Sequence, residues 1–393
     1  NALVANTTGA NNTALGAFTL AASNSSNNVA IGIYAANQTT TGDNLVAVGR
    51  YALKDNTTGS GNVAVGLNAL ETNTTASNNT AVGTQAMEDN TTGTSNVAIG
   101  YQALKVNTTA SNNTAVGNQA MIANTTGDSN VAVGVNALDA NTTGSGVVAI
   151  GMGALSANTT ASFNNAVGYN ALTNNTTATK NNAFGSYALD ACTTGDRNQA
   201  MGNNALGALT TGVRNVAIGN DSMVTITTGN RNVAIGEQTL YNYTGDDSVA
   251  VGNKALLAAT TGNQNVAVGS NALLQNDSGT YNVAIGYNAA YSQTNDQKNV
   301  AVGYKALEDN TTSSQTAIGF QALLNCTTGD GNTAIGANCM TTCTTGRINV
   351  MVGNDGYSAL TTGYFNTGIG YEVGNQITTG YQNVLLGFYA GRS

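Results

Sequence analysis

The sequence contains no proline, no tryptophan and no histidine, and only 8% of its 393 residues are charged. The absence of histidine excludes catalysis by an imidazole group. Because ordinary soluble domains carry about 25% charged residues, this surface must be built from Asn, Thr, Ser and Gly instead. Large apolar side chains are also scarce, since much of the 41% apolar fraction is alanine. The composition therefore excludes one thick globular core and allows only a thin, elongated one.

Basic residues are few, with 12 Lys and Arg against 20 Asp and Glu. This acidic balance argues against nucleic acid as a partner, because no basic patch can neutralise phosphates, and equally against an anionic membrane surface. We expect no membrane insertion, since no apolar run approaches the roughly 18 residues that a spanning helix needs. The first residues open in the middle of a repeat and show no signal-peptide pattern. We therefore expect this chain to be a fragment of a longer protein.

A repeat with a period of 17 runs through the whole sequence. With Asn62 as position 1, one unit reads N-V-A-V-G-L-N-A-L-E-T-N-T-T-A-S-N and ends at Asn78. Position 5 is glycine in all 23 units, and the spacing between these glycines is 17, except for three spacings of 16. An unvarying glycine predicts a corner with positive φ or a close backbone approach. A fixed period of this kind is typical of repeat architectures.

The apolar pattern within each unit favours strands over helices. Short runs such as V-A-V between Asn and Gly predict two or three short strands per unit. Position 4 is always apolar and position 9 is Leu or Met in most units, so we predict that both face the interior. The predicted fold is all-β: a parallel β-solenoid (β-roll or β-helix) of about 23 coils, forming a single continuous domain over residues 1–393. At about 4.8 Å per coil, the rod would be roughly 110 Å long.

Two columns of asparagine accompany this pattern. Position 1 is Asn in 19 of the 23 units, and position 12 is Asn in every unit from Asn56 to Asn175. Stacked side-chain amides can bond to one another as ladders. The Asn-Thr-Thr triplets are formally glycosylation sequons. However, position 12 becomes Cys, Leu or Ile further along the chain, which favours an inward-facing ladder over a sugar-bearing surface.

The Thr-Thr pair at positions 13 and 14 predicts a third β-segment. Rows of threonine also raise the question of ice binding. Adjacent residues of a strand point to opposite faces, so this pair does not form the outward Thr-x-Thr array that a flat ice-binding face needs.

No motif in the sequence indicates catalysis. Most acidic residues fall at the variable positions 10, 11, 16 and 17, and we interpret them as solvated loop charges. A catalytic pair of carboxylates would interrupt the repeat, and no irregular coil is visible. The Gly-Asp pairs lack the nonapeptide period of calcium-binding solenoids. We therefore predict a protein that is not an enzyme and has no catalytic, cofactor-binding or metal site.

Cysteine gives one candidate pair. Cys326 and Cys343 both occupy position 12 and lie one coil apart. Their Cα atoms should be about 4.8 Å apart, which is within disulfide reach. Side chains that stack in parallel strain a disulfide, so we favour stacked free thiols and keep the disulfide as the alternative.

Aromatic residues gather in the last three coils, residues 351–393, where the alanine of position 3 is also lost. One interpretation is a transition where the rod thickens or meets another domain. The other is an interaction patch, since exposed aromatic rings suit recognition of carbohydrate or protein. The candidate patch consists of Tyr357, Tyr364, Phe365, Tyr371, Tyr381, Phe388 and Tyr389.

The segment from Asn96 to Ala103, N-V-A-I-G-Y-Q-A, is similar to the head repeats of YadA-like trimeric autotransporter adhesins. The full unit, with its A-L-x-x-N-T-T-G, resembles long repeat tracts of phage tail-fibre-like and bacterial surface fibre proteins. The resemblance covers the whole chain. It implies a homotrimer on a cell or virion surface that meets a host receptor or glycan. It transfers no functional residue.

Two functions of different classes follow. The first is a structural shaft of an extracellular fibre, whose exposed end coils are covered by flanking domains or by end-to-end assembly into a filament. The alternative is a binding module whose own flank recognises glycan, host protein or ice. The strip of Ala at position 3 and Gly at position 5 could let neighbouring chains approach, or could line the narrow interior of one solenoid. The sequence leaves both open.

Overall fold

The computed structural model describes residues 2–392, which form strands and turns and contain no helix. The chain comprises two compact units, Asn1–Arg197 and Asn198–Ser393. The strands of the first unit are β1 (Thr13–Leu15), β2 (Val29–Ile31), β3 (Val46–Val48), β4 (Val63–Val65), β5 (Thr80–Val82), β6 (Val97–Ile99), β7 (Thr114–Val116), β8 (Val131–Val133), β9 (Val148–Ile150), β10 (Asn165–Val167) and β11 (Asn182–Phe184). The strands of the second unit are β12 (Gln199–Met201), β13 (Val216–Ile218), β14 (Val233–Ile235), β15 (Val249–Val251), β16 (Val266–Val268), β17 (Val283–Ile285), β18 (Val300–Val302), β19 (Thr316–Ile318), β20 (Thr333–Ile335), β21 (Val350–Val352), β22 (Thr367–Ile369) and β23 (Val384–Leu386).

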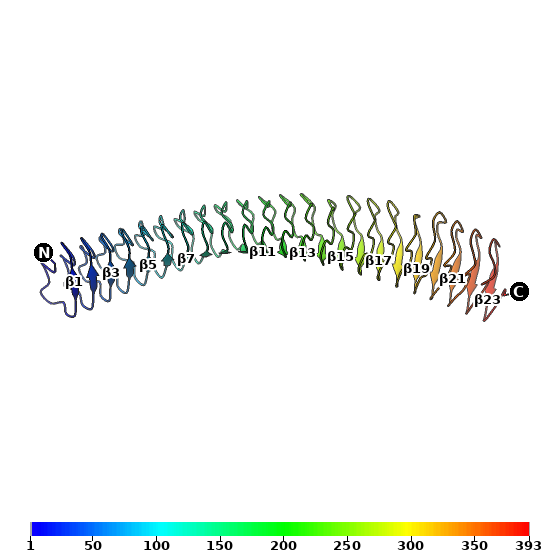
Figure 1. Ribbon diagram of the computed structural model, residues 1–393, viewed down its shortest axis with the longest axis horizontal. Helices are drawn as coiled ribbons and strands as arrows, with labels where there is room; N and C mark the ends of the chain where they lie inside the picture. Colours follow the sequence, from blue (N-terminus) through cyan, green and yellow to red (C-terminus); the bar gives the residue numbers. More distant parts are fainter. Residues whose placement is uncertain (1, 393) are drawn as a thin grey trace. The chain divides into compact units, whose positions relative to one another are not determined.

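Within each unit, every strand pairs in parallel with the strand of the next coil, one repeat further along the sequence (Figure 1). In the first unit, for example, Ala98 of β6 lies opposite Ala115 of β7. In the second, Ala234 of β14 lies opposite Ala250 of β15. Identical positions of successive coils are therefore stacked on one another. The prediction of an all-β parallel solenoid with one repeat per coil is confirmed.

Each coil contains one strand of three residues, so the prediction of two or three strands per coil is wrong. The Thr-Thr segment forms no strand, although the N–H of Thr57 donates to the carbonyl of Thr74 in the next coil at 2.8 Å. Elsewhere in the coil, positions 7, 9 and 17 adopt left-handed backbone conformations, as at Asn68 (φ 57°), Leu70 (φ 51°) and Asn78 (φ 62°). Left-handed residues interrupt an extended chain.

A sequence signal for these turns was present. Positions 7 and 9 hold no Val, Ile or Thr in any of the 23 coils. β-Branched side chains are strongly disfavoured in the left-handed region, so their absence marks the positions where the chain turns.

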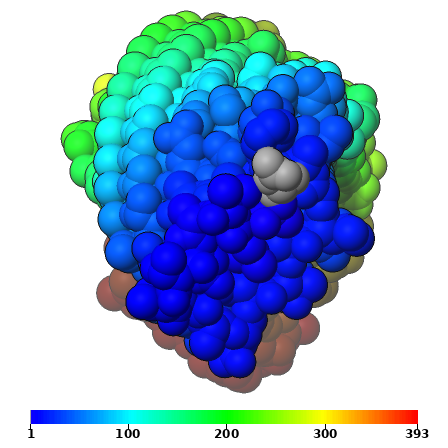
Figure 2. Space-filling view, turned by 90° about the vertical axis from the view of Figure 1, so that its left-hand side faces the viewer, coloured from blue at the N-terminus to red at the C-terminus, as the bar shows by residue number. Residues whose placement is uncertain are grey.

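The interior of the coil is narrow and lined mainly by small residues. The alanines of positions 3 and 8 and the Leu or Met of position 9 are buried, as at Ala64, Ala69 and Leu70, each 0% exposed. Viewed from the N-terminal end, the described atoms of the first coils fill the cross-section and enclose no open lumen (Figure 2). The position 3 alanine therefore lines the interior of its own chain, which settles one question that the sequence left open.

The prediction that position 4 faces the interior is wrong. Ile99 in β6 is 40% exposed, whereas Ala98 beside it is fully buried. Successive residues of a strand point to opposite faces, so either the alanine or its two larger neighbours can face inward. The narrow coil leaves little room beside the residue of position 9, so strands β2 to β20 bury their central alanine and direct the two larger residues outward.

The glycine at position 5 has both properties that its invariance predicts. Its φ lies between +131° and +143° in the first 22 coils. A Cβ on Gly134 would stand 2.5 Å from the carbonyl oxygen of Gly151 in the next coil. Any side chain here would force neighbouring coils apart.

Three coils, residues 12–27, 232–247 and 299–314, are shorter than the others by one residue. In each of them the missing residue falls between positions 12 and 16, and the strand keeps its pairing, as Ile235 with Val251 shows. Length variation is tolerated there because that segment is a turn and not a strand.

We predict that Gly134→Val lowers the free energy of unfolding by about 3 kcal/mol or more, because it combines overpacking with a forbidden φ. Thermal melting of the purified chain measures this. Asp139→Ala in the same coil should change stability far less, since one carboxylate oxygen of Asp139 is buried without a partner. Gly387→Val is the matched control: φ is 112° there, but a Cβ would meet nothing within 4 Å. Equal melting temperatures for the Gly134 and Gly387 variants would contradict the close-approach explanation.

Candidate functional site

The surface that stands out is the outward side of the strands, formed by positions 2 and 4, which we call the sheet face. Position 4 is apolar in all 23 coils. Its side chains are partly exposed to solvent: Ile150 is 38% exposed, Phe184 41% and Met201 52%. Position 2 is Val or Thr in 20 coils and is mostly half-buried.

No charged residue occurs at position 2 or position 4 in any coil. Exposed apolar surfaces larger than a few hundred Å² are uncommon on monomeric proteins and mark interaction sites. A run of parallel strands with an apolar outer face has the character of a packing surface. Sequence reasoning missed this face because it assigned the larger apolar column to the interior.

The asparagines of position 12 form the predicted ladder inside the coil. Asn124 is fully buried. Its Nδ2 donates to Asn107 Oδ1 at 3.1 Å and to the carbonyl of Gly127 at 3.0 Å, while its Oδ1 accepts from Asn141. Seven such side-chain bonds join Asn56 to Asn175 without interruption. The sequon asparagines of this run are therefore occupied inside the folded chain.

The asparagines of position 1 form a second ladder with a different pattern. Asn79 Oδ1 accepts from the backbone N–H of Asn96, one coil further, at 2.9 Å. Its Nδ2 donates to the carbonyl of Gly93 in its own coil at 2.8 Å. Each of these side chains thus closes its own coil and binds the next one.

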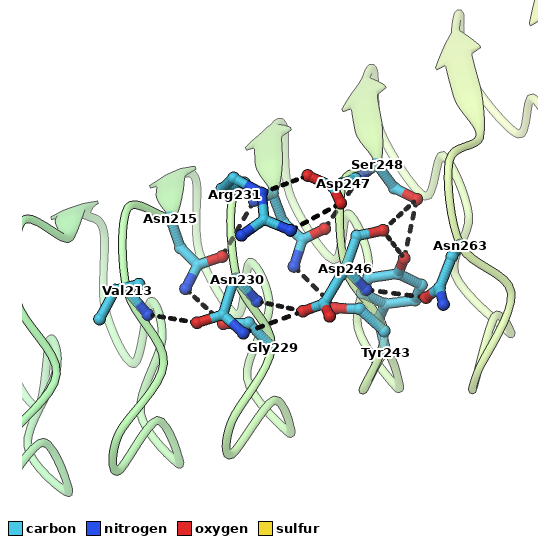
Figure 3. Close-up of polar contacts among 12 residues, drawn as sticks. Val213, Asn215, Gly229, Asn230, Arg231, Tyr243, Asp246, Asp247, Ser248 and Asn263 are labelled. Atoms are coloured by element: carbon cyan, nitrogen blue, oxygen red, sulfur yellow. Dashed lines mark hydrogen bonds and ion pairs between the residues drawn. The ribbon is translucent and has the colours of Figure 1, made fainter.

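Position 16 forms a third ladder that sequence reasoning missed. In the second unit, the N–H of Val213 donates to Asn230 Oδ1, the N–H of Asn230 to Asp246 Oδ1, and the N–H of Asp246 to Asn263 Oδ1, at 2.6 to 3.0 Å (Figure 3). The acidic side chains of this position are structural acceptors and not merely solvated charges. The signal was the preference of this position for short polar residues.

The same close-up shows how a shorter coil is completed. Tyr243 takes position 12, and its hydroxyl lies 2.7 Å from Ser248 Oγ and donates to the carbonyl of Asp246 (Figure 3). Burial raises the pKa of Tyr243 to about 12. Beside it, Arg231 forms a two-pronged ion pair with Asp247 at 2.5 and 2.7 Å, and this hydrogen bonding lowers the pKa of Asp247. These groups are thus engaged in bonds with one another and with the backbone of their own coils.

The aromatic residues stack along the coils. Tyr287, Tyr304 and Phe320 form a column with ring centroids 5.6 and 5.2 Å apart and nearly parallel planes. In the candidate patch, Tyr364 stacks on Tyr381 and Tyr371 on Phe388. Of the first column, Tyr304 has a stacked ring on both sides.

Six of the seven residues of the candidate patch lie at the surface, and one does not. Tyr357 is fully buried, whereas Phe365, Tyr371, Tyr381 and Phe388 are exposed, and Tyr364 and Tyr389 are half-buried. Phe388 lies against both Tyr371 and Tyr389. Tyr364 contacts Phe365 edge to face. The structure thus places the six surface rings in two separate groups of contacts.

Tyr357 explains why the alanine column ends. It replaces the Leu of position 9, and the next coil has glycine at positions 3 and 9. A Cβ on Gly368 would stand 2.8 Å from the Tyr357 ring, and one on Gly374 would also clash with it. The two glycines make room for one large ring, so the departure from the repeat has a local packing reason.

All four cysteines are free and buried. Cys326 and Cys343 are close enough for their thiols to hydrogen-bond, and this bond together with burial raises the pKa of Cys343 above its ordinary value. Burial also raises the pKa of Cys192 to about 11. Stacked thiols are therefore the arrangement that the structure contains.

One coil, residues 282–298, breaks the position 12 ladder. It is the only coil with Gln at position 12, Gln293, and with an acidic residue at position 15, Asp296. Asn276 Oδ1 in the preceding coil, both polar side-chain atoms of Gln293 and Asp296 Oδ2 are buried without a hydrogen-bond partner. Burial raises the pKa of Asp296. The longer Gln293 amide fails to donate to Asn276 as an asparagine would.

Within residues 2–392 there is no group of three or more His, Cys, Asp and Glu side chains suited to holding a metal ion. That part of the chain also has no helical segment with the length and apolarity that crossing a bilayer requires. No protein-family model matches the chain, and no curated protein matches it. Functional inference therefore rests on the surface itself.

We predict that Asn124→Asp lowers the free energy of unfolding at neutral pH by about 3 kcal/mol, because it removes a donor and buries a charge. Burial would raise the pKa of the new carboxyl in the folded state above its unfolded value of about 3.9. The stability deficit should therefore be small below that pH and should grow as the pH rises. Denaturation at several pH values measures this. Asn118→Asp, at an exposed position, is the control. A deficit independent of pH would contradict the ladder assignment.

We also predict that Gln293→Asn raises stability by about 1 kcal/mol, because the shorter amide can donate to Asn276 Oδ1 and restore the ladder. Thermal melting measures the change. The control is Gln376→Asn, which makes the same chemical change at an exposed site. A destabilised Gln293→Asn variant beside an unchanged control would contradict the prediction, because it would show that glutamine stabilises the fold more than asparagine at this position.

Proposed function

We propose that this protein is a structural shaft of an extracellular fibre, as in an adhesin, a surface filament or a virion tail fibre, and that it catalyses no reaction. Its role is to give the fibre length and stiffness. The repeated bonding between coils supports a stiff element, because within each unit strand pairing joins successive coils and many of them are also joined by ladders at position 1, 12 or 16. The location outside the cell follows from the resemblance to surface fibre repeats.

The observation that carries the proposal is the apolar, uncharged sheet face. In a shaft that remained monomeric, an unbroken column of apolar side chains would stay exposed to water, which is unfavourable. A strand segment of three residues is roughly 10 Å long and a coil adds about 4.8 Å, so each coil contributes roughly 48 Å². The 11 strands of the first unit offer roughly 530 Å² and the 12 strands of the second roughly 580 Å². A stable protein–protein interface buries about 800 Å² per partner.

The partner that fits this face is a second copy of the chain. Apolar side chains recur once per coil, at the coil spacing, and only a surface with the same period can pack against them over many coils. A further copy supplies that period directly. We therefore propose lateral self-association through the sheet face, with the homotrimer of the resembling fibres as the expected state.

The alternative function, a binding module for glycan, host protein or ice, has less support. Sugar rings bind aromatic residues on the flat face, and neighbouring rings in the columns cover part of that surface. The exposed threonine of position 14, as at Thr126, forms a single file. The threonine of position 13 donates its hydroxyl to the next coil, as Thr125 does to Thr142.

The test places charge on the sheet face. Ile99→Lys with Ile150→Lys should convert the assembled protein to monomers, because a buried unpaired ammonium is strongly unfavourable. The matched control is Thr109→Lys with Thr160→Lys, which adds the same charge at exposed positions of the same two coils. Sedimentation equilibrium gives the stoichiometry, and circular dichroism verifies that both variants are folded. A monomeric wild-type chain, or an unchanged assembly in the sheet-face variant, would refute lateral association.

A further inference from the structure

One coil of the second unit, residues 282–298, departs from the repeat twice at the same corner. Position 12 is Gln293, and position 15 is Asp296, where every other 17-residue coil has glycine or alanine. In regular coils these two positions adjoin, since a Cβ on Gly93 would stand 2.6 Å from Asn90 Oδ1. A carboxylate at position 15 is therefore placed beside the position 12 amide.

The contacts around this corner also include the preceding coil. A Cβ on Gly279 would stand 2.2 Å from Asn276 Oδ1 and 2.2 Å from the carbonyl oxygen of Asp296, so these two oxygens are at most twice that distance apart. The backbone N–H of Thr294 donates to the Asp296 carboxylate, which holds that carboxylate against its own coil. Gln293 and Asn276 occupy the same column, one coil apart, and both are fully buried.

Four polar atoms of these residues are buried without a hydrogen-bond partner. They are Asn276 Oδ1, Gln293 Oε1, Gln293 Nε2 and Asp296 Oδ2. None of the ion pairs formed within residues 2–392 includes Asp296. Buried polar atoms without partners are uncommon and unfavourable. The corner thus holds three buried oxygens, one of them from a carboxylate, that the chain itself does not satisfy.

We propose that this corner binds a hard metal cation of the class of Ca²⁺ or Na⁺ through Asn276 Oδ1, Gln293 Oε1 and Asp296 Oδ2. Carboxylate and amide oxygens are ligands that Ca²⁺ takes in proteins. The proposal goes beyond the role of a fibre shaft and is independent of lateral association. A site with one carboxylate and two amides differs from the groups of three or more His, Cys, Asp and Glu that usually mark a metal centre.

A cation fits these atoms better than a water molecule alone. Water has two hydrogens to donate, so it serves two of the three oxygens and brings no charge to balance the carboxylate. A cation contacts all three oxygens and neutralises the charge. Ca²⁺ also keeps water among its ligands, and such a water can accept a hydrogen bond from Gln293 Nε2.

The bound cation joins two successive coils where the position 12 ladder is interrupted. Asn276 belongs to one coil, and Gln293 and Asp296 belong to the next. The cation takes the place of the missing bond between side-chain amides. Because it binds the folded corner and not the unfolded chain, the stability of the protein depends on the cation concentration.

The test is thermal melting of the full chain in increasing CaCl₂ or NaCl, compared with choline chloride at the same ionic strength. Choline is too large and too apolar to enter a corner of buried oxygens. We expect the melting temperature to rise and then to saturate with Ca²⁺ or Na⁺, relative to choline. The salt that gives the rise identifies the cation.

Two variants restore residues that are common at their positions and should therefore fold. Asp296→Gly removes the carboxylate, and Gln293→Asn engages Asn276 Oδ1 in the ladder. Both should abolish the cation-dependent rise. The matched control is Asp309→Asn, which removes an exposed carboxylate from the next coil and should keep the rise. Equal melting temperatures of the wild-type chain in all three salts, or an undiminished rise in the Asp296→Gly variant, would overturn the proposal.

Discussion

Within each unit of this protein, the backbones of successive coils approach one another closely at the position 5 glycine, where no side chain would fit. The carbonyl of one glycine lies where a side chain of the preceding glycine would be, as between Gly134 and Gly151. This approach sets the spacing at which strands pair and at which side-chain amides reach from coil to coil. The asparagine ladders at positions 1 and 12 depend on that spacing, because an amide bridges only about 3 Å.

A coil as short as this one encloses little volume, and this constraint decides which residues are inside. Alanine at positions 3 and 8 fills the space together with one larger residue at position 9. Where a larger side chain occupies the interior, the neighbouring positions hold smaller residues: glycine at positions 368 and 374 leaves room for the ring of Tyr357. Polar groups complete the interior, since closing a turn every few residues leaves many backbone carbonyls and N–H groups that need partners. The core thus combines apolar packing with hydrogen-bonded amides.

The same narrowness places the larger apolar residues outside. The Val and Ile of position 4 cannot share the interior with the leucine column, so they form an apolar surface that a single chain leaves open to water. A repeat that fills a thin coil with alanine leaves its larger apolar residues on the other side of the strands. Our proposal of lateral association rests on this exposed apolar face.

The sequence by itself determined the repeat, the parallel stacking, the glycine corner and the asparagine ladder of position 12. Each of these follows from residue types that recur at one period. When coils stack, equivalent residues lie above one another in columns, whatever the shape of the coil. Only the tertiary structure decided which side of the strand faces inward, that each coil has one strand, and that the short polar residues of position 16 form a ladder. A strand of three residues gives no preference between its two faces until the width of the coil is known. That width depends on the left-handed turns at positions 7, 9 and 17, whose only trace in the sequence is the near absence of β-branched residues.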